Sequence, residues 1–203
     1  MDYLISTEQC CVPYILKIET NQPILVYLDD IFEHYQKNTT PINTLMNINN
    51  KIIITFKNKK KPSRKNKTRT LFTPHGNRLI TETEYSSLIK VISPFYHEDF
   101  NTFVIKNDNE SFEYFAPKDF YEAISFLKEN KLIDTSFLYD LTKNGKLIIN
   151  KDIVSVNDEY TCECCCKSEY LRHLYKLNEI NAYITLQRHN LLAWDNIVKE
   201  IKK

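Results

Sequence analysis

The chain contains two glycines in 203 residues, and this scarcity restricts its fold more than any other feature. Glycine adopts positive φ without steric cost, so turns and helix ends that need left-handed backbone have few glycines available here. Glycine also forms the loops that bind phosphate groups, and the sequence has neither a GxGxxG nor a GxxxxGK[ST] motif. Nucleotide-binding folds that depend on those loops are therefore excluded.

The composition is that of a globular protein. Hydrophobic residues make up 42% of the chain, with thirteen tyrosines and eleven phenylalanines, enough for one good core or two small ones. Residues 1–12 lack the features of a secretory signal, and no apolar run is long enough to span a membrane. We expect an intracellular protein without membrane contact. The abundance of Asn, Lys, Ile and Tyr is typical of AT-rich genomes such as those of large DNA viruses, which would place it in the host cytoplasm or nucleus.

Two stretches that lie 89 residues apart, 14–33 and 103–122, share a pattern. Each has an aromatic–aliphatic–aliphatic–Lys strand, a polar turn, a second apolar strand, and a helix that begins at Asp30 or Asp119. A short helix and two strands follow in both copies, and then another helix. In the first copy Thr81 and Glu84 form a Ser/Thr-x-x-Glu capping box for that last helix.

This pattern predicts an α+β fold with two tandem hairpin–helix–helix–strand–strand–helix units and a C-terminal helix. We expect residues 1–100 to form the first unit, with a basic insert at 57–69. Residues 101–180 would form the second unit. Residues 181–203 would form the closing amphipathic helix.

The basic insert belongs to a stretch, residues 51–69, that holds nine Lys or Arg and no acidic residue. The rest of the chain then has 27 − 9 = 18 basic residues against 26 acidic ones, a net charge of −8. Such a charge block is typical of an interaction surface for a polyphosphate, because each neutralised phosphate releases a counterion. A solvated loop with spare charge is the alternative. The predicted phosphate contacts are Lys57, Lys59, Lys60, Lys61, Arg64, Lys65, Lys67 and Arg69.

Three segments resemble the N-terminal domain of BRO proteins and phage anti-repressors, and the related KilA-N domains of large DNA viruses. They are FVIKNDNESFEYFAPKDFYEAISFL at 103–127, DDIFEHY at 29–35 and LFTPHGNRLITETEYSSLIKVI at 71–92. The resemblance implies DNA binding, in agreement with the basic insert. We therefore expect a viral nucleic-acid-binding protein, with DNA as the partner, that uses the basic loop for phosphate contacts.

Two other functions remain open. The first is a viral interaction protein that binds a host or viral protein, or forms a homodimer, through the second unit and the C-terminal helix. The second is a metal-dependent nuclease assembled from His75, His97, Glu98 and Asp99 near a phosphate-binding loop. No known nuclease or Ser–His–Asp signature is present, so the sequence favours a protein that is not an enzyme and needs no cofactor.

A cysteine cluster is the most unusual local feature. Cys162, Cys164 and Cys166 could hold zinc with a fourth ligand from His173, Cys10 or Cys11. A second Cys-x-x-Cys pair is absent from the sequence. We expect reduced, buried cysteines without metal, with zinc binding and redox chemistry as the alternatives.

Overall fold

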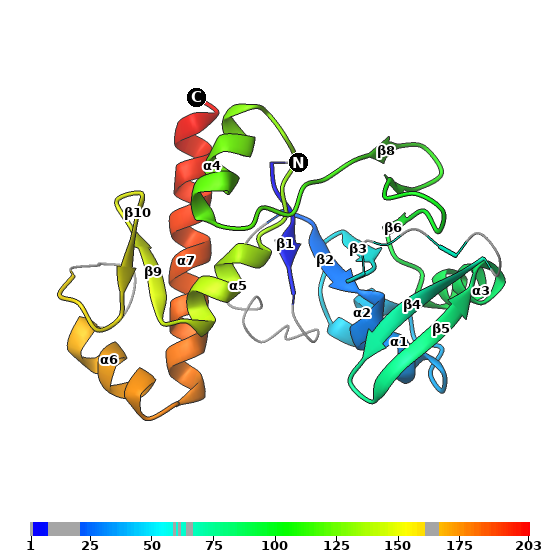
Figure 1. Ribbon diagram of the computed structural model, residues 1–203, viewed down its shortest axis with the longest axis horizontal. Coiled ribbons are helices and arrows are strands. Elements are labelled where there is room, and N and C mark those ends of the chain that lie inside the picture. The colour runs from blue at the N-terminus through cyan, green and yellow to red at the C-terminus, as the bar shows by residue number, and fades with distance from the viewer. Residues whose placement is uncertain (1, 8–20, 59, 61, 64–66, 161–166) are drawn as a thin grey trace. The chain divides into compact units, whose positions relative to one another are not determined.

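The computed structural model describes residues 2–7, 21–58, 60, 62–63, 67–160 and 167–203 (Figure 1). The chain divides into two compact units. Unit 1 contains the described residues of 3–7 and Asn21–Phe115, and unit 2 contains Ala116–Lys203 with Asp2. The predicted α+β class and the C-terminal helix are confirmed. Among the described residues, no helix is both long enough and apolar enough to cross a membrane.

Unit 1 is built on a mixed sheet with the strand order β1-β2-β3-β6-β7-β8. The first four strands run parallel, and β7 and β8 continue the sheet antiparallel. The central strands have the sequences ILVY and IIIT and are buried almost throughout, as expected for parallel strands whose two faces are both covered. The strands are β1 (Ile5–Ser6), β2 (Ile24–Tyr27), β3 (Ile52–Thr55), β6 (Tyr96–Glu98), β7 (Ile105–Lys106) and β8 (Ser111–Phe112).

Helices and one hairpin connect the parallel strands of unit 1. α1 (Leu28–Tyr35) and α2 (Ile42–Met46) link β2 to β3. The antiparallel hairpin of β4 (Thr68–Thr73) and β5 (Gly76–Thr81) follows β3 and leads into α3 (Glu82–Ile92). The predicted capping box of α3 is confirmed, because the Glu84 N–H donates to the Thr81 hydroxyl and the Thr81 N–H donates to the Glu84 carboxylate.

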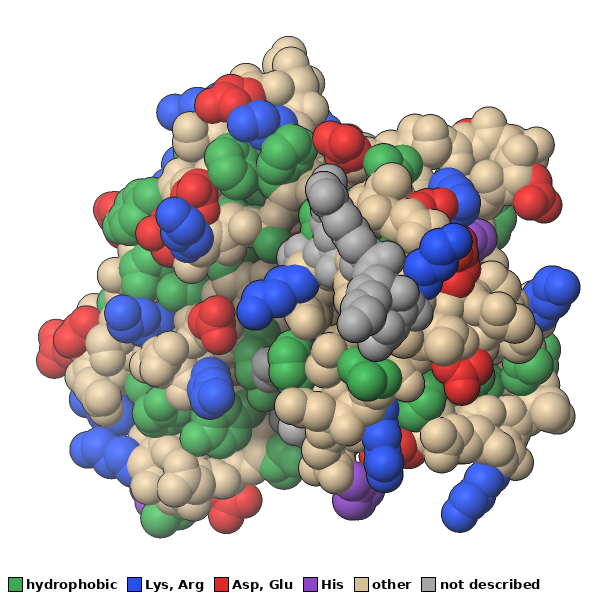
Figure 2. Space-filling view, turned by 45° about the vertical axis from the view of Figure 1, so that its right-hand side comes forward, with side chains coloured by type: hydrophobic (Ala, Val, Ile, Leu, Met, Phe, Trp, Pro, Cys, Tyr) green, Lys and Arg blue, Asp and Glu red, His purple; other side chains and the backbone are tan. Residues whose placement is uncertain are grey.

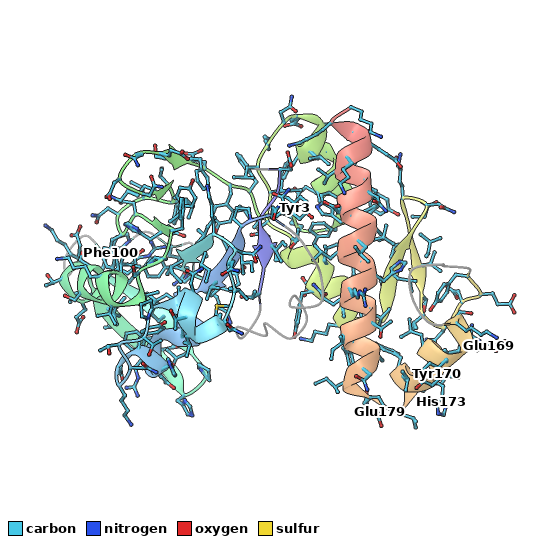
Figure 3. All side chains as sticks on the ribbon, turned by 180° about the vertical axis from the view of Figure 1, so that it is seen from behind. Tyr3, Phe100, Glu169, Tyr170, His173 and Glu179 are labelled. Atoms are coloured by element: carbon cyan, nitrogen blue, oxygen red, sulfur yellow. The ribbon has the colours of Figure 1, made fainter. Side chains whose placement is uncertain are left out.

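An aromatic cluster fills part of the core of unit 1. The ring centroids of Phe56 and Tyr85 are 5.1 Å apart, and those of Tyr85 and Phe100 are 5.5 Å apart. Figure 3 labels Phe100. The Tyr85 hydroxyl donates to the carbonyl of Glu98 at 2.5 Å, and burial raises the pKa of this phenol far above its ordinary value. These contacts fix α3 against the end of β6.

Unit 2 is organised around its long C-terminal helix, α7, which packs against α4, α5, α6 and β9 (Figure 1). Its predicted apolar face is buried, with Leu186 and Trp194 completely enclosed. The Trp194 ring lies 5.1 Å from Phe137 and 6.2 Å from Phe120. The elements are α4 (Phe120–Lys128), α5 (Ser136–Lys143), β9 (Lys146–Ile149), β10 (Asp152–Ser155), α6 (Ser168–Lys176) and α7 (Ile180–Ile201).

The pairing of the strands differs from the predicted repeat. The repeat makes β3 and β4 the counterparts of β9 and β10. In unit 2, β9 and β10 form an antiparallel hairpin, whereas in unit 1 β3 pairs in parallel with β2 and β6, and β4 pairs with β5. The hairpin of β7 and β8 was predicted to open the second unit, and it pairs instead with β6 of unit 1. The two helix starts also differ, because Asp119 is the N-cap of α4 whereas Asp30 lies inside α1, whose N-cap is Tyr27. The shared pattern marks helices and apolar strands, and it contains no information on strand direction.

Candidate nucleic-acid interface

The β4–β5 hairpin has one face toward the core and one toward solvent. Facing pairs on the inner side include Arg69 with Ile80, both buried. On the outer side Thr70 faces Leu79 and Phe72 faces Asn77. Phe72 is 48% exposed and Leu79 is 67% exposed, so the outer face presents apolar groups to solvent. A two-stranded ribbon of this kind can place flat and apolar side chains against unstacked bases.

The buried carboxylate of Asp29 holds the hairpin to the carboxyl end of the parallel strands. Asp29 is the second residue of α1, two residues after the end of β2. Its two oxygens accept the backbone N–H groups of Lys57 at 2.9 Å and Phe72 at 2.7 Å. Asp30, next in the chain, pairs with the Lys57 ammonium at 2.5 Å. The first turn of α1 therefore fixes both the segment that follows β3 and the C-terminal part of β4.

A second link is the ion pair between Arg69 and Glu98, whose side chains are 1% and 0% exposed. An Arg69 guanidinium nitrogen lies 3.0 Å from a Glu98 carboxylate oxygen, and Glu98 also accepts the hydroxyl of Thr55. The guanidinium lies over the ring of Phe56 at 3.8 Å and donates to the carbonyl of Asn58. Because its side chain is almost completely buried among these groups, Arg69 is part of the interior of unit 1.

The hairpin tip is joined to α1 by Glu33. Its carboxylate accepts the Thr73 hydroxyl at 2.8 Å and contacts Nδ1 of His75. The hydrogen bond from Thr73, together with His75 and Arg78, lowers the pKa of Glu33 below its ordinary value. His75 is 77% exposed, so this contact orients a surface imidazole at the tip.

The predicted phosphate-binding residues lie in different environments. Arg69 is buried, which corrects the expectation that it reaches a phosphate. Lys57 is 29% exposed and paired with Asp30, whereas Lys60 and Lys67 are exposed and make no ion pair within the described part of the chain. Lys67 has a positive φ of 45° and directly precedes β4. The other four predicted contacts, Lys59, Lys61, Arg64 and Lys65, lie outside the described residues.

The residues of the predicted nuclease site are not brought together as a metal centre. Glu98 is committed to Arg69, and Asp99 pairs with the Lys106 ammonium. His75 contacts Glu33 at the hairpin tip. Within the described ranges, three or more His, Cys, Asp or Glu side chains nowhere group in a way that could hold a metal ion.

The cysteines of the candidate metal or redox site fall outside the described residues. Residues 161–166 and Cys10 and Cys11 lie outside the described part of the chain. His173, a possible fourth ligand, lies on α6 beside the exposed Tyr170 (Figure 3).

Charges of both signs are mixed on the molecular surface that Figure 2 shows. Lys and Arg side chains alternate there with Asp and Glu, and the described residues on that face form no continuous cationic patch. A surface of mixed charge favours a few local phosphate contacts over attraction by a large region of positive potential. Lys60 and Lys67, which both precede the hairpin in sequence, are two described cations that could make such contacts.

Neither the outer face of the hairpin nor the role of Asp29 was predicted from the sequence. The alternation in TRTLFT at 68–73, with Arg69, Leu71 and Thr73 buried, is a period-two signal that could have identified the exposed Phe72. The long-range partners of Asp29 have no comparable local signal, since they lie 28 and 43 residues away.

Comparison with known proteins gives one partial match. A family model described as queuine tRNA-ribosyltransferase matches residues 133–203, which are 71 of the 203 residues and lie within unit 2. No curated protein matches the chain. The chain is thus similar, over its C-terminal third, to a family named for a reaction on tRNA.

This finding corrects the predicted family and function. The match is to a tRNA-modifying family and not to BRO-N or KilA-N domains, so the resemblance to those viral domains was wrong. The viral DNA-binding protein, the viral interaction protein and the nuclease are overturned with it. The resemblance rested on segments such as DDIFEHY, which combine an acidic helix start with apolar residues. Carboxylates stabilise the first turn of any helix, so this pattern identifies a helix and not a family.

Proposed function

We propose that this protein binds RNA of the tRNA class. The observation that carries the proposal is the match of residues 133–203 to the queuine tRNA-ribosyltransferase family, whose name specifies tRNA. The concentration of cations at 51–69 supports it independently, because RNA is a polyphosphate.

The β4–β5 hairpin is the surface of unit 1 that we assign to this role. Its outer face exposes Phe72 and Leu79, and Lys67 precedes its first strand. Exposed apolar and aromatic groups beside cations suit single-stranded loops of RNA, where unstacked bases meet side chains while phosphates meet ammonium groups. The inner face is held by Asp29 and Arg69, so the outer face is presented on a fixed support.

Binding assays with different nucleic acids test this function. Folded tRNA, a single-stranded RNA and a DNA duplex of equal length would be titrated with the full chain at several salt concentrations. We expect tRNA to bind most tightly, because its loops offer both unpaired bases and clustered phosphates. Equal affinity for the DNA duplex, or no retention of tRNA at low salt, would contradict the proposal.

The hairpin assignment needs its own variants. Phe72→Ala removes an exposed ring and should weaken tRNA binding by roughly tenfold, in line with about 1–3 kcal/mol for a base stacked on an aromatic side chain. Phe95→Ala is a matched control, because Phe95 is exposed to a similar extent, 46%, but lies outside the hairpin. Similar losses from both variants would contradict the assignment of the hairpin as the binding surface.

A further inference from the structure

Unit 2 contains a pocket between α5 and α7 with a volume of about 240 Å³. Two aromatic rings, one cation and two neutral hydrogen-bonding groups line it: Tyr139, Thr142, Lys143, Tyr183 and Gln187. All five residues lie inside the span that matches the tRNA-modifying family. The combination of flat apolar walls with a few polar groups is typical of a small-ligand site.

The wall formed by Tyr183 is supported from behind. Its ring lies 5.5 Å from Tyr175, whose hydroxyl donates to the carbonyl of Lys143 at 3.2 Å. Tyr175 lies directly against Gly145, where an added Cβ would come within 2.6 Å of the ring. The Tyr183 hydroxyl donates to Asn178 at 3.1 Å. The ring is therefore held in place before any ligand arrives.

The floor of the pocket is Gln187, which is 7% exposed. Its Oε1 lies 2.7 Å from the Thr142 hydroxyl, whose single proton has two acceptors in range, this oxygen and the Leu138 carbonyl at 2.9 Å. The oxygen of that hydroxyl accepts an N–H from Asn190. Asn190 is fixed in turn, since it accepts from Ile148 N and donates to the carbonyl of Lys146. These contacts hold the side-chain amide of Gln187 against Thr142, with Oε1 facing the hydroxyl.

The amide nitrogen of Gln187 keeps its donors for a ligand. It makes no hydrogen bond to any described residue. It is also absent from the completely enclosed polar atoms without a partner, so part of its surface is accessible. Two N–H donors on a fixed carbon frame are suited to an oxygen or nitrogen acceptor on the edge of a planar ring. The ring itself would lie against the tyrosines.

Lys143 adds a positive charge at the same pocket. Its side chain is exposed, and within the described residues its ammonium group makes no ion pair. A phosphate attached to the planar ligand would find there the point charge that lysine offers.

We propose that this pocket binds a single nucleotide, with the base against Tyr139 and Tyr183, a base acceptor on Gln187 and the phosphate near Lys143. The inference deepens the proposed RNA binding and rests on it, since RNA is the source of an unstacked nucleotide. The pocket accommodates one base and not a helix, so it would read a nucleotide that has left its stack.

Titration of the full chain with nucleoside 5′-monophosphates tests the pocket directly. The resonances of the Gln187 side-chain amide would be followed by NMR, with the unphosphorylated nucleosides as a second series. We expect the Gln187 signals to shift with a monophosphate and the nucleosides to bind more weakly. Lys143→Gln should weaken monophosphate binding about tenfold and leave nucleoside binding unchanged. Lys128→Gln, an exposed lysine on α4 outside the pocket, should change neither.

The outcomes separate this inference from the RNA function. Unmoved Gln187 signals at millimolar monophosphate, in a protein that still retains tRNA, would overturn the pocket and leave the RNA function standing. Shifted signals that depend on Lys143, in a protein that does not retain tRNA, would support the pocket and overturn the RNA function. An equal effect of Lys143→Gln and Lys128→Gln would also overturn the pocket.

Discussion

At the scale of single residues, the pair of Arg69 and Glu98 ties β4 to the end of β6 inside unit 1. A charge taken out of water is costly unless a partner compensates it, and here each side chain is the partner of the other. Thr55 and the ring of Phe56 complete the surroundings of the pair. The role of Arg69 is therefore to position the hairpin, although it ends a segment that is rich in lysine.

Removing one partner of this pair should be costly. Glu98→Ala leaves the buried guanidinium of Arg69 uncompensated, and we expect the free energy of unfolding to fall by about 3–5 kcal/mol. Urea denaturation measures the change. The double variant Arg69→Met, Glu98→Leu should recover most of this stability, because it removes both charges. A decrease below about 1 kcal/mol for Glu98→Ala would show that the pair is not buried as described.

His189 makes the stability depend on pH. Burial lowers its pKa below the ordinary value of 6.5, and its Nε2 lies 2.8 Å from the Ile148 carbonyl. The unfolded chain takes up a proton at a pH where the folded chain does not, so stability falls as the pH drops from 6.5 toward the folded-state pKa. The slope from one such group is at most about 1.4 kcal/mol per pH unit.

The variant His189→Gln keeps a side-chain donor for Ile148 but does not titrate. We expect its free energy of unfolding, measured by urea denaturation between about pH 5 and 7, to depend less steeply on pH. The slope should fall by up to about 1.4 kcal/mol per pH unit, which corresponds to one proton. His97, whose pKa burial and Lys106 also lower, should retain its own contribution in this variant. An unchanged slope would contradict the buried, neutral state of His189.

At the scale of the elements, asparagine takes the place that glycine has in other chains. Gly76 and Gly145 have positive φ, and so do seven other described residues. Four of these are asparagines, whose short amide side chain tolerates left-handed backbone better than most. They lie at the ends of helices and in the β9–β10 turn: Asn47, Asn130, Asn150 and Asn178. The scarcity of glycine therefore did not prevent tight turns.

The capping box of α3 offers a test at this scale. Thr81→Ala removes the hydroxyl that accepts the Glu84 N–H, and we expect about 1 kcal/mol of destabilisation in thermal or urea unfolding. Thr83→Ala is the matched control, because Thr83 is exposed in the first turn and does not cap the helix. It should be neutral or slightly stabilising, since alanine has the higher helix propensity. Equal effects of the two changes would contradict the capping role of Thr81.

Much of the secondary structure could be predicted from the sequence, but its pairing could not. The runs IIIT and KLII, the cap at Thr81 and the apolar face of α7 follow from periodicity and local chemistry. The parallel pairing of β2 with β3 depends on helices that span the distance between strand ends, which a local pattern does not encode. The same limit applies to the site. Cations near residue 60 were visible in the sequence, whereas the burial of Arg69 depended on Glu98, 29 residues further on.

At the scale of the whole molecule, the proposed nucleic-acid contacts are of a different kind in each unit. Unit 1 has the hairpin with exposed Phe72 and exposed lysines just before it in the chain. Unit 2 has the pocket with Gln187 and Lys143, inside the span that resembles the tRNA-modifying family. Phosphate contacts would supply affinity and the pocket would supply selectivity for a nucleotide.

The most direct test of RNA binding is the salt dependence of tRNA affinity in two matched double variants. Lys60→Gln with Lys67→Gln removes two exposed lysines that precede the hairpin in the chain, and Lys37→Gln with Lys90→Gln removes two exposed lysines elsewhere in unit 1. Both change the net charge equally. We predict that the first variant alone lowers the slope of log affinity against log salt, by about 0.7–0.9 for each phosphate that is no longer neutralised. Identical slopes in the two variants, or a wild-type protein whose tRNA binding does not respond to salt, would contradict the account.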